Sequence, residues 1–329
     1  MVDRQGMQEA IEGMADHLRE GDRVGRAAGE LLPLPSAVVI AGMGGSAMSG
    51  ELLRGLVLHG CPVPVTRVRG FGIPTWAGPG TLVVCSSYSG DTMETLSCAE
   101  QAHRQGATII GVGIGGQLGA HAEEWGAPFA CIPGGLMPRA ALGYLFGAMA
   151  GAFGACGLAR PGIAEECARG VEQVDRTAAE ALGERIADTV PLIYGAGPLA
   201  AVAYRWKTQL NENAKMHAFS HAFPELDHNE IVGWQGTPSG RFSAVMLRDP
   251  AEGKDVRRMI DVTADLIEPD AVFVEQVSAP GETHAARAFG AVAHGDWVSF
   301  FAALARGVDP TPVERIFALK QRLATWPIR

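Results

Sequence analysis

The feature that most constrains the fold is an opening that occurs once in each half of the chain: an apolar strand, a glycine turn and a helix. In the first half, residues 37–41 form the apolar run and Gly42-Met43-Gly44-Gly45-Ser46 the turn. In the second half, Gly195-Ala196-Gly197 follows the apolar residues 190–194. Short apolar runs that alternate with helical segments are typical of parallel sheets covered by helices on both faces. The pattern predicts an α/β protein with two doubly wound domains, each a three-layer α/β/α sandwich.

The remaining elements are expected from hydrophobic periodicity. Strands are expected at 37–41, 63–68, 82–85, 108–112 and 129–132 in the first half and at 190–194, 244–247 and 272–276 in the second. Helices are expected at 4–20, 47–59, 92–104, 143–157, 199–214, 253–266, 283–304 and 311–325, and residues 164–182 form a polar helical sequence. A chain of 329 residues is longer than one core usually serves. We therefore place domains at 1–155 and 156–329.

A second feature is a turn rich in hydroxyl groups after the strand at 82–85. Within seven residues the chain places four hydroxyl side chains, Ser86, Ser87, Ser89 and Thr92. Gly90 allows a tight turn, and the free N–H groups at the start of the next helix favour an anion. The turn suits a phosphate group that needs no metal. A serine-rich turn that only caps the helix is the alternative interpretation.

The first glycine turn also matches the weak dinucleotide pattern G-x-G-x-x-A at residues 42–47. That pattern expects an acidic residue about 20 positions later, and residues 63–69 contain none. Arg67 or Arg69 could contact a 2′-phosphate, so NADP remains open as a ligand. The preferred interpretation is a close backbone approach to a small ligand.

Composition narrows the possible partners. The net charge is −9 and no cluster of Lys and Arg appears, which argues against nucleic acid. Six cysteines lack any C-x-x-C pair, so we expect reduced thiols and a cytoplasmic protein. No apolar run is expected to reach transmembrane length, and the polar start does not resemble a signal peptide. No motif indicates a metal or redox cofactor. His217 and His221 are four residues apart, so they could bind one metal together only if the segment were a helix.

Three further blocks allow a family to be suggested. They are Met-Pro-Arg-Ala-Ala-Leu-Gly-Tyr-Leu at 137–145, Asn-Glu-Asn-Ala-Lys at 211–215 and Pro-Glu-Leu-Asp-His-Asn-Glu-Ile-Val-Gly-Trp at 224–234. Together with the two loops, they resemble the bifunctional phosphoglucose/phosphomannose isomerases, which belong to the sugar isomerase (SIS) superfamily. The resemblance extends from about residue 30 to residue 329.

The resemblance implies a site for a sugar phosphate. Its phosphate would be bound by five residues of the two loops, Gly45, Ser46, Ser87, Ser89 and Thr92. The family often has Asn where this chain has Asp91. A negative charge there disfavours phosphate unless Asp91 points away to cap a helix.

The resemblance also implies catalytic residues. Glu212 would be the base and Arg139 would face the reacting carbons. His228 would open the sugar ring, and it is expected from the partner subunit of a homodimer. Lys320 would face the sugar, and Thr311 would tune the acceptance of the two C2 epimers. We expect Glu212, at the end of a helix, to lie near the carboxyl edge of the second sheet, where open α/β sheets bind ligands.

These residues predict an aldose–ketose isomerase. It would interconvert glucose 6-phosphate, and mannose 6-phosphate, with fructose 6-phosphate through an enediolate. Two alternatives remain: a non-catalytic SIS protein that senses a sugar phosphate, and an isomerase for another sugar phosphate. The Ala/Gly-rich helices at 143–157 and 285–305 would form either the dimer interface or core within a domain.

Overall fold

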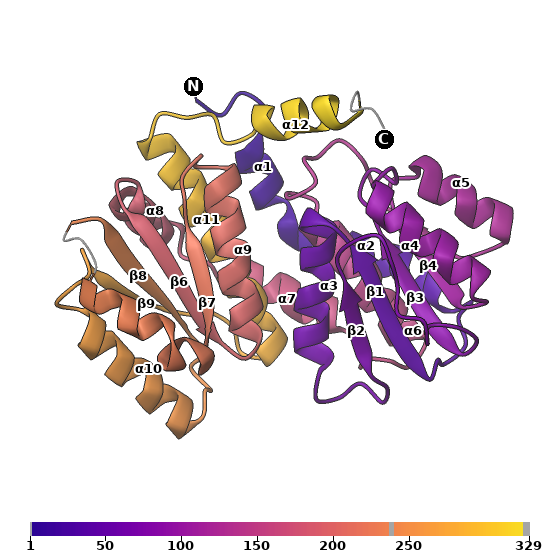
Figure 1. Cartoon of the computed structure of the whole chain (residues 1–329), viewed down its shortest axis with the longest axis horizontal. Coiled ribbons are helices and arrows are strands. Elements are labelled where there is room, and N and C mark those ends of the chain that lie inside the picture. The colour runs from indigo at the N-terminus through magenta and orange to yellow at the C-terminus, as the bar shows by residue number, and fades with distance from the viewer. Residues whose placement is uncertain (1, 237–239, 325–329) are drawn as a thin grey trace.

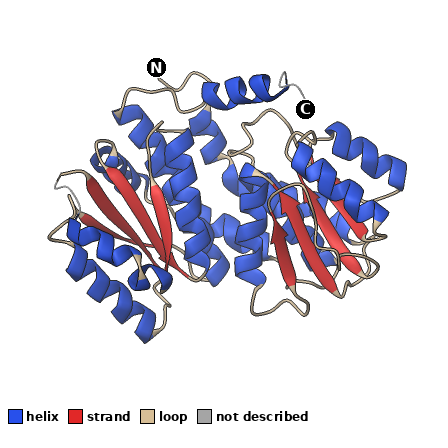
Figure 2. Cartoon of the chain, viewed as in Figure 1, coloured by secondary structure: helices blue, strands red, loops and turns tan. Residues whose placement is uncertain are grey.

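The computed structural model describes residues 2–236 and 240–324. Its strands are β1 (Ala37–Gly42), β2 (Val65–Val68), β3 (Thr81–Ser86), β4 (Thr108–Gly113), β5 (Phe129–Cys131), β6 (Val190–Ala196), β7 (Phe219–Phe223), β8 (Phe242–Arg248) and β9 (Val274–Ser278). They form a five-stranded sheet of order β2-β1-β3-β4-β5 and a four-stranded sheet of order β7-β6-β8-β9, one in each half of the molecule (Figure 2). Every strand pair is parallel.

Helices cover both sheets (Figure 1). They are α1 (Met7–Glu12), α2 (Met14–Gly29), α3 (Gly44–Val57), α4 (Met93–Arg104), α5 (Gly116–Trp125), α6 (Leu142–Ala155), α7 (Ile163–Glu172), α8 (Arg176–Ile186), α9 (Pro198–Glu212), α10 (Lys254–Ile267), α11 (His284–Ala305) and α12 (Glu314–Ala324), with 3-10 turns η1 (Glu225–His228) and η2 (Glu230–Gly236). The predicted α/β class and its two parallel sheets are therefore confirmed.

The element predictions differ from the structure in a few places. The helix expected at 4–20 is two helices, α1 and α2, which meet at Gly13. Helix α5 and strand β7 were not expected at all. The last residue of the helix expected at 311–325 lies outside the described residues.

Helices α2 and α6 pack with their backbones almost in contact, and glycine makes this possible. A Cβ atom on Gly25 of α2 would overlap the carbonyl group of Ala148 in α6. A Cβ atom on Gly147 of α6 would in turn overlap the Leu18 carbonyl of α2. The glycine-rich helix expected at 143–157 thus belongs to the core within this chain.

Helix α11 corrects one expectation. By length and composition, His284–Ala305 is apolar enough to cross a membrane, although no run of that length was expected. In the structure 83% of its apolar window is buried inside the protein. It packs on α7, α8 and α9, as the core helix of a folded domain does.

The chain direction decides where the two sheets present their loops. Strands β1 and β3 end at Gly42 and Ser86, so both predicted phosphate loops leave the carboxyl edge of the first sheet. Helix α9 follows β6 and runs back along the sheet, as crossover helices between parallel strands do. Its last residue, Glu212, therefore lies at the amino edge of the second sheet.

Candidate active site

The two loops at the carboxyl edge of the first sheet are tied to each other by their hydroxyl groups. The Ser46 hydroxyl accepts a hydrogen bond from the Tyr88 backbone N–H at 3.2 Å. The Ser87 hydroxyl donates to Thr92 Oγ1 at 2.9 Å and accepts from the Gly90 N–H at 3.1 Å. Ser46 and Ser87 are buried. The structure thus brings the serines of both loops together beside the start of α4.

Asp91 turns away from these serines. Its carboxylate accepts a hydrogen bond from the Gln117 N–H at 3.0 Å, in the first turn of α5. Its own N–H donates to the hydroxyl of Ser89, which is exposed. A negative charge at a helix N-terminus is favourable. Asp91 therefore caps a helix, but the helix is α5 and not α4, which follows it directly.

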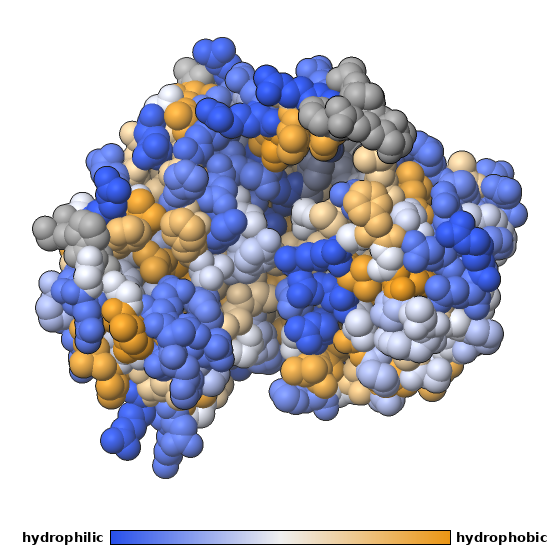
Figure 3. Space-filling view, in the orientation of Figure 1, coloured by the Kyte–Doolittle hydropathy of each residue, from blue (hydrophilic) through white to orange (hydrophobic). Residues whose placement is uncertain are grey.

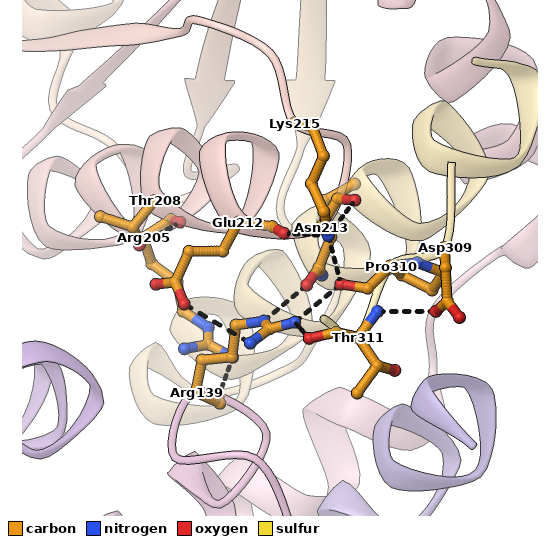
Figure 4. Close-up of polar contacts among 10 residues, drawn as sticks. Arg139, Arg205, Thr208, Glu212, Asn213, Lys215, Asp309, Pro310 and Thr311 are labelled. Atoms are coloured by element: carbon orange, nitrogen blue, oxygen red, sulfur yellow. Dashed lines mark hydrogen bonds and ion pairs between the residues drawn. The ribbon is translucent and has the colours of Figure 1, made fainter. Parts of the chain in front are cut away.

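Arg139 lies between the two halves of the molecule (Figure 4). Its side chain is only 4% exposed. Its guanidinium donates to Asn213 Oδ1 at 2.7 Å, to the Pro310 carbonyl at 2.7 Å and to the Thr311 carbonyl at 2.9 Å. Burial lowers the pKa of Arg139, and the nearby Glu212 carboxylate opposes that change. Three fixed bonds leave Nη1 as the nitrogen that faces Glu212.

The segment that carries Arg139 is pressed against the glycine-serine turn. A Cβ atom on Gly45 would lie 2.7 Å from the Pro138 carbonyl oxygen, so glycine is required for this approach. From the other side, Arg205 of α9 donates to the Arg139 carbonyl at 3.1 Å. Arg205 is itself paired with Asp296 of α11 at 2.9 and 2.5 Å, with both side chains buried. Both domains therefore fix the Arg139 backbone.

Glu212 ends α9 with its side chain 32% exposed, and its Oε2 lies 3.5 Å from Arg139 Nη1. It lines a pocket of about 860 Å³ whose other walls include Lys215 and the segment 308–316. The space-filling view shows a recess between the two halves of the molecule (Figure 3). The expectation that Glu212 lies near the carboxyl edge is wrong: a neighbouring pocket joins Lys215 to Val190 and Arg241, where β6 and β8 begin.

His228 is not brought to this site within the chain. It is exposed and ends η1, directly after the carboxyl end of β7. Glu212 lies at the opposite edge of the same sheet. The five residues of β7 alone span about 17 Å. Glu212 and His228 of one chain are therefore not neighbours.

The remaining predicted residues lie at different distances from the centre of the site. Thr311 is buried beside Arg139, and its hydroxyl has no hydrogen-bond partner in the described part of the chain. Lys320 is exposed on α12, and in the described part of the chain it makes no hydrogen bond or ion pair with Glu212 or Arg139. His217 precedes β7 and His221 lies in it, so the helix that a shared metal would require does not form. Among residues 2–236 and 240–324, no three His, Cys, Asp or Glu side chains gather as a metal site.

Three residues of the site were not expected. Asn213 orients Arg139 and donates to Ser299 Oγ at 2.9 Å. Asn213 lies inside the Asn-Glu-Asn-Ala-Lys block, so its presence at the site could have been predicted from that block. The Arg205–Asp296 pair had none, because its partners are far apart in the sequence.

Similarity to known proteins shows the family of this chain. A family model described as the bacterial phospho-glucose isomerase C-terminal SIS domain matches residues 175–323. The chain is 39% identical to the bifunctional phosphoglucose/phosphomannose isomerase of Caldicellulosiruptor bescii, over 87% of this chain and 89% of that protein. It is 36% identical to the protein of the same name from Thermoplasma acidophilum, over 88% and 90%.

A solved structure supports the fold. Tagatose-6-phosphate ketose/aldose isomerase from Escherichia coli superposes with a TM-score of 0.73 at 16% identity, and the match covers 93% of this chain and 95% of that one. Identity this low speaks for the fold alone. The relatives that are more than 30% identical along nearly their full length identify the family: this chain is a member of the bifunctional phosphoglucose/phosphomannose isomerases.

Proposed function

We propose that the protein interconverts glucose 6-phosphate, and mannose 6-phosphate, with fructose 6-phosphate. The observation that carries this proposal is the contact of Arg139 with Glu212 at 3.5 Å, while the Arg139 segment packs on Gly45 of the glycine-serine turn. A carboxylate and a fixed cation thus lie beside a loop suited to phosphate. The family name of the relatives supports the same reaction.

In this mechanism the phosphate lies at Gly45, Ser46, Ser87, Ser89 and Thr92. Their hydroxyl and N–H groups, with the N-termini of α3 and α4, provide donors for its oxygens. The hydroxyls of Ser46 and Ser87 now accept hydrogen bonds from the protein. The Ser46 hydroxyl can direct its own proton toward a phosphate oxygen, and the Ser87 hydroxyl can do so by giving up its donation to Thr92 Oγ1.

Glu212 moves the proton. It removes the hydrogen from C2 of the open aldose, and the electron pair of that bond forms the C1–C2 double bond as O1 gains negative charge. Glu212 then returns the proton to C1 while the proton of O2 passes to O1, so that O2 becomes the ketone oxygen and O1 becomes the C1 hydroxyl. Arg139 stabilises the oxyanion of the enediolate between these steps, because a fixed positive donor in a partly dry site favours developing negative charge. Thr311, buried beside Arg139, is the proposed determinant of C2-epimer acceptance.

Ring opening requires a second subunit. We propose a homodimer in which His228 of the partner subunit opens the ring, because Glu212 and His228 of one chain lie at opposite edges of a sheet. Helix α12 carries exposed apolar residues, Ile316, Phe317, Leu319 and Leu323, and this surface suits such an assembly. Lys320 on the same exposed helix would reach a sugar only when α12 is held in place.

The cellular location and the domain boundary are also part of the proposal. Six unpaired cysteines support a reducing, cytoplasmic location. We also retain the domain boundary after residue 155, where α6 ends.

The test is a coupled assay with purified protein and each aldose phosphate, run beside fructose 6-phosphate in deuterated water. We expect turnover and the incorporation of solvent deuterium at the reacting carbon. Glu212→Gln should lower kcat by at least about 10²-fold, whereas Glu184→Gln, an exposed residue of α8, should not. Sugar-phosphate binding without turnover would favour a sensor, and turnover of only pentose or heptulose phosphates would favour another isomerase.

A further inference from the structure

Lys215 has no role in the proposed mechanism, although it closes the Asn-Glu-Asn-Ala-Lys block. Among residues 2–236 and 240–324, it is the one non-glycine residue with a positive φ, at 54°. This left-handed conformation costs free energy for any residue that has a Cβ atom, and glycine or asparagine usually occupies it. A lysine at such a position requires a compensating interaction, and a strained residue next to a reaction centre suggests a function.

The compensating interaction is made by the ammonium group. Lys215 Nζ donates to the carbonyl of Glu212 at 2.7 Å, of Asn213 at 3.3 Å and of Pro310 at 2.9 Å (Figure 4). The first two carbonyls belong to the end of α9, where a helix leaves its acceptors without internal partners. The third belongs to the segment that leads to α12. Arg139 donates to the same Pro310 carbonyl at 2.7 Å.

Pro310 is therefore the point at which three parts of the molecule meet. Arg139 reaches it from the first domain, and Lys215 reaches it from the end of α9. Because Lys215 also holds the Glu212 carbonyl, one ammonium group connects the backbone of the proposed base to the carbonyl that fixes the proposed oxyanion donor. Arg139 also joins the end of α9 to Pro310, but at α9 it bonds side-chain oxygens of Glu212 and Asn213, whereas Lys215 bonds their backbone carbonyls.

We propose that Lys215 is a positioning residue that sets the distance between the Glu212 carboxylate and the Arg139 guanidinium by clamping the end of α9 to Pro310. This inference rests on the proposed isomerase function. The clamp uses all three N–H donors of an ammonium group, whereas a neutral amine has only two. Its strength should therefore depend on protonation.

The charges around Lys215 set the pH at which the clamp weakens. Burial and the repulsion of Arg139 lower the pKa of Lys215 to about 8, against the attraction of Asp309, Glu212 and Glu314. The ammonium form is complete well below that pH and is lost as the pH rises through it. We expect kcat to fall on that alkaline side without a matching rise in KM.

The experiment compares Lys215→Met, Lys215→Asn and Lys215→Arg with Lys254→Met, an exposed lysine at the start of α10. Methionine keeps an unbranched side chain without the ammonium group, and asparagine tolerates the left-handed backbone. Both should lower kcat about tenfold or more with KM within about twofold, because small displacements of catalytic groups are costly. Arginine should retain most of kcat and move the alkaline limb to higher pH. Lys254→Met should match the wild type.

The result that overturns the clamp is wild-type kcat in Lys215→Met or Lys215→Asn, or an alkaline limb in Lys215→Arg at the same pH as in the wild type. Amide hydrogen exchange gives a readout that does not need turnover. Exchange at residues 213–216 and 309–311 should be faster in Lys215→Asn than in the wild type, and unchanged exchange rejects the clamp. A wild-type protein without turnover would reject the isomerase, while the exchange result would still decide the clamp.

Discussion

Replacing Arg139 tests whether one buried guanidinium serves both the fold and the reaction. Arg139→Met removes the donor to Asn213 Oδ1 and to the Thr311 carbonyl, and neither acceptor has another donor among the described residues. The Pro310 carbonyl keeps the ammonium of Lys215. Two buried acceptors are thus left unsatisfied, at about 1–3 kcal/mol each. Methionine is uncharged, so it also removes the unfavourable free energy of burying the guanidinium charge, which offsets part of this loss. We therefore expect the free energy of unfolding to fall by about 2–4 kcal/mol.

The catalytic loss should be separate from the loss of stability. Only Nη1 of Arg139 faces Glu212, so one donor to the enediolate disappears, which typically lowers kcat about 10²- to 10³-fold. Arg139→Lys restores the charge but not the planar fork of donors, so kcat should stay about tenfold or more below the wild type. Urea unfolding and the coupled fructose 6-phosphate assay measure the two quantities on the same preparations.

Arg248→Met is the matched control. Arg248 is also mostly buried and donates to Glu252, Asp261 and Gln276, but it ends β8 at the opposite edge of the sheet from Glu212. It should lose stability and keep kcat. The reasoning about Arg139 is refuted if Arg139→Met retains kcat within about threefold, or if Arg248→Met loses as much kcat as Arg139→Met does.

Two further substitutions test the framework behind the site. Gly25→Ala should lower the free energy of unfolding by about 3 kcal/mol or more, because its methyl group overlaps the Ala148 carbonyl of α6; an unfolding midpoint equal to the wild type would show that α2 and α6 are not in close contact. Asp296→Asn leaves the Arg205 guanidinium buried without its counter-charge and should cost about 3–5 kcal/mol in urea unfolding. Its KM for fructose 6-phosphate should change less than its kcat, since Arg205 holds the Arg139 backbone.

The sequence predicted most elements because buried parallel strands leave continuous apolar runs. Strand β7 was missed for a physical reason: it is the edge strand of the second sheet, and its residues, Phe-Ser-His-Ala-Phe, are mostly half-exposed or exposed. Helix α5 was missed because its N-cap, Gly115, and its first residue, Gly116, are both glycine, so it lacks an apolar start. The hydrophobic pattern of the sequence is therefore a weak signal for edge strands that are only partly buried and for helices that begin with glycine.

The site was predicted only in part. The hydroxyl loop after β3 could be named from its compact sequence, and Arg139 and Glu212 were suggested by the resemblance of their blocks to a known family. Their geometry could not be predicted in the same way. The end of α9 faces the amino edge of its sheet, and Arg205 meets Asp296 across 91 positions of sequence. Both facts depend on the tertiary arrangement of the helices and strands, which hydrophobic periodicity does not predict.

The proposed dimer makes one prediction that a single-chain site does not. Because Glu212 and His228 lie at opposite edges of the second sheet, a shared site must take Glu212 from one subunit and His228 of the partner subunit. Glu212→Gln and His228→Ala should each be inactive alone. In a mixed dimer, one of the two sites combines an intact Glu212 from one chain with an intact His228 from the other.

Co-expression of the two variants therefore restores activity by subunit symmetry. With random pairing, half of the dimers are mixed and half of their sites are intact, which gives roughly a quarter of wild-type turnover. Co-expression of Glu212→Gln with Glu212→Gln,His228→Ala provides the control, since it rebuilds no complete site. If activity in the mixture equals that of the control, each subunit uses its own His228 or none, and the exchange of this histidine between subunits is wrong.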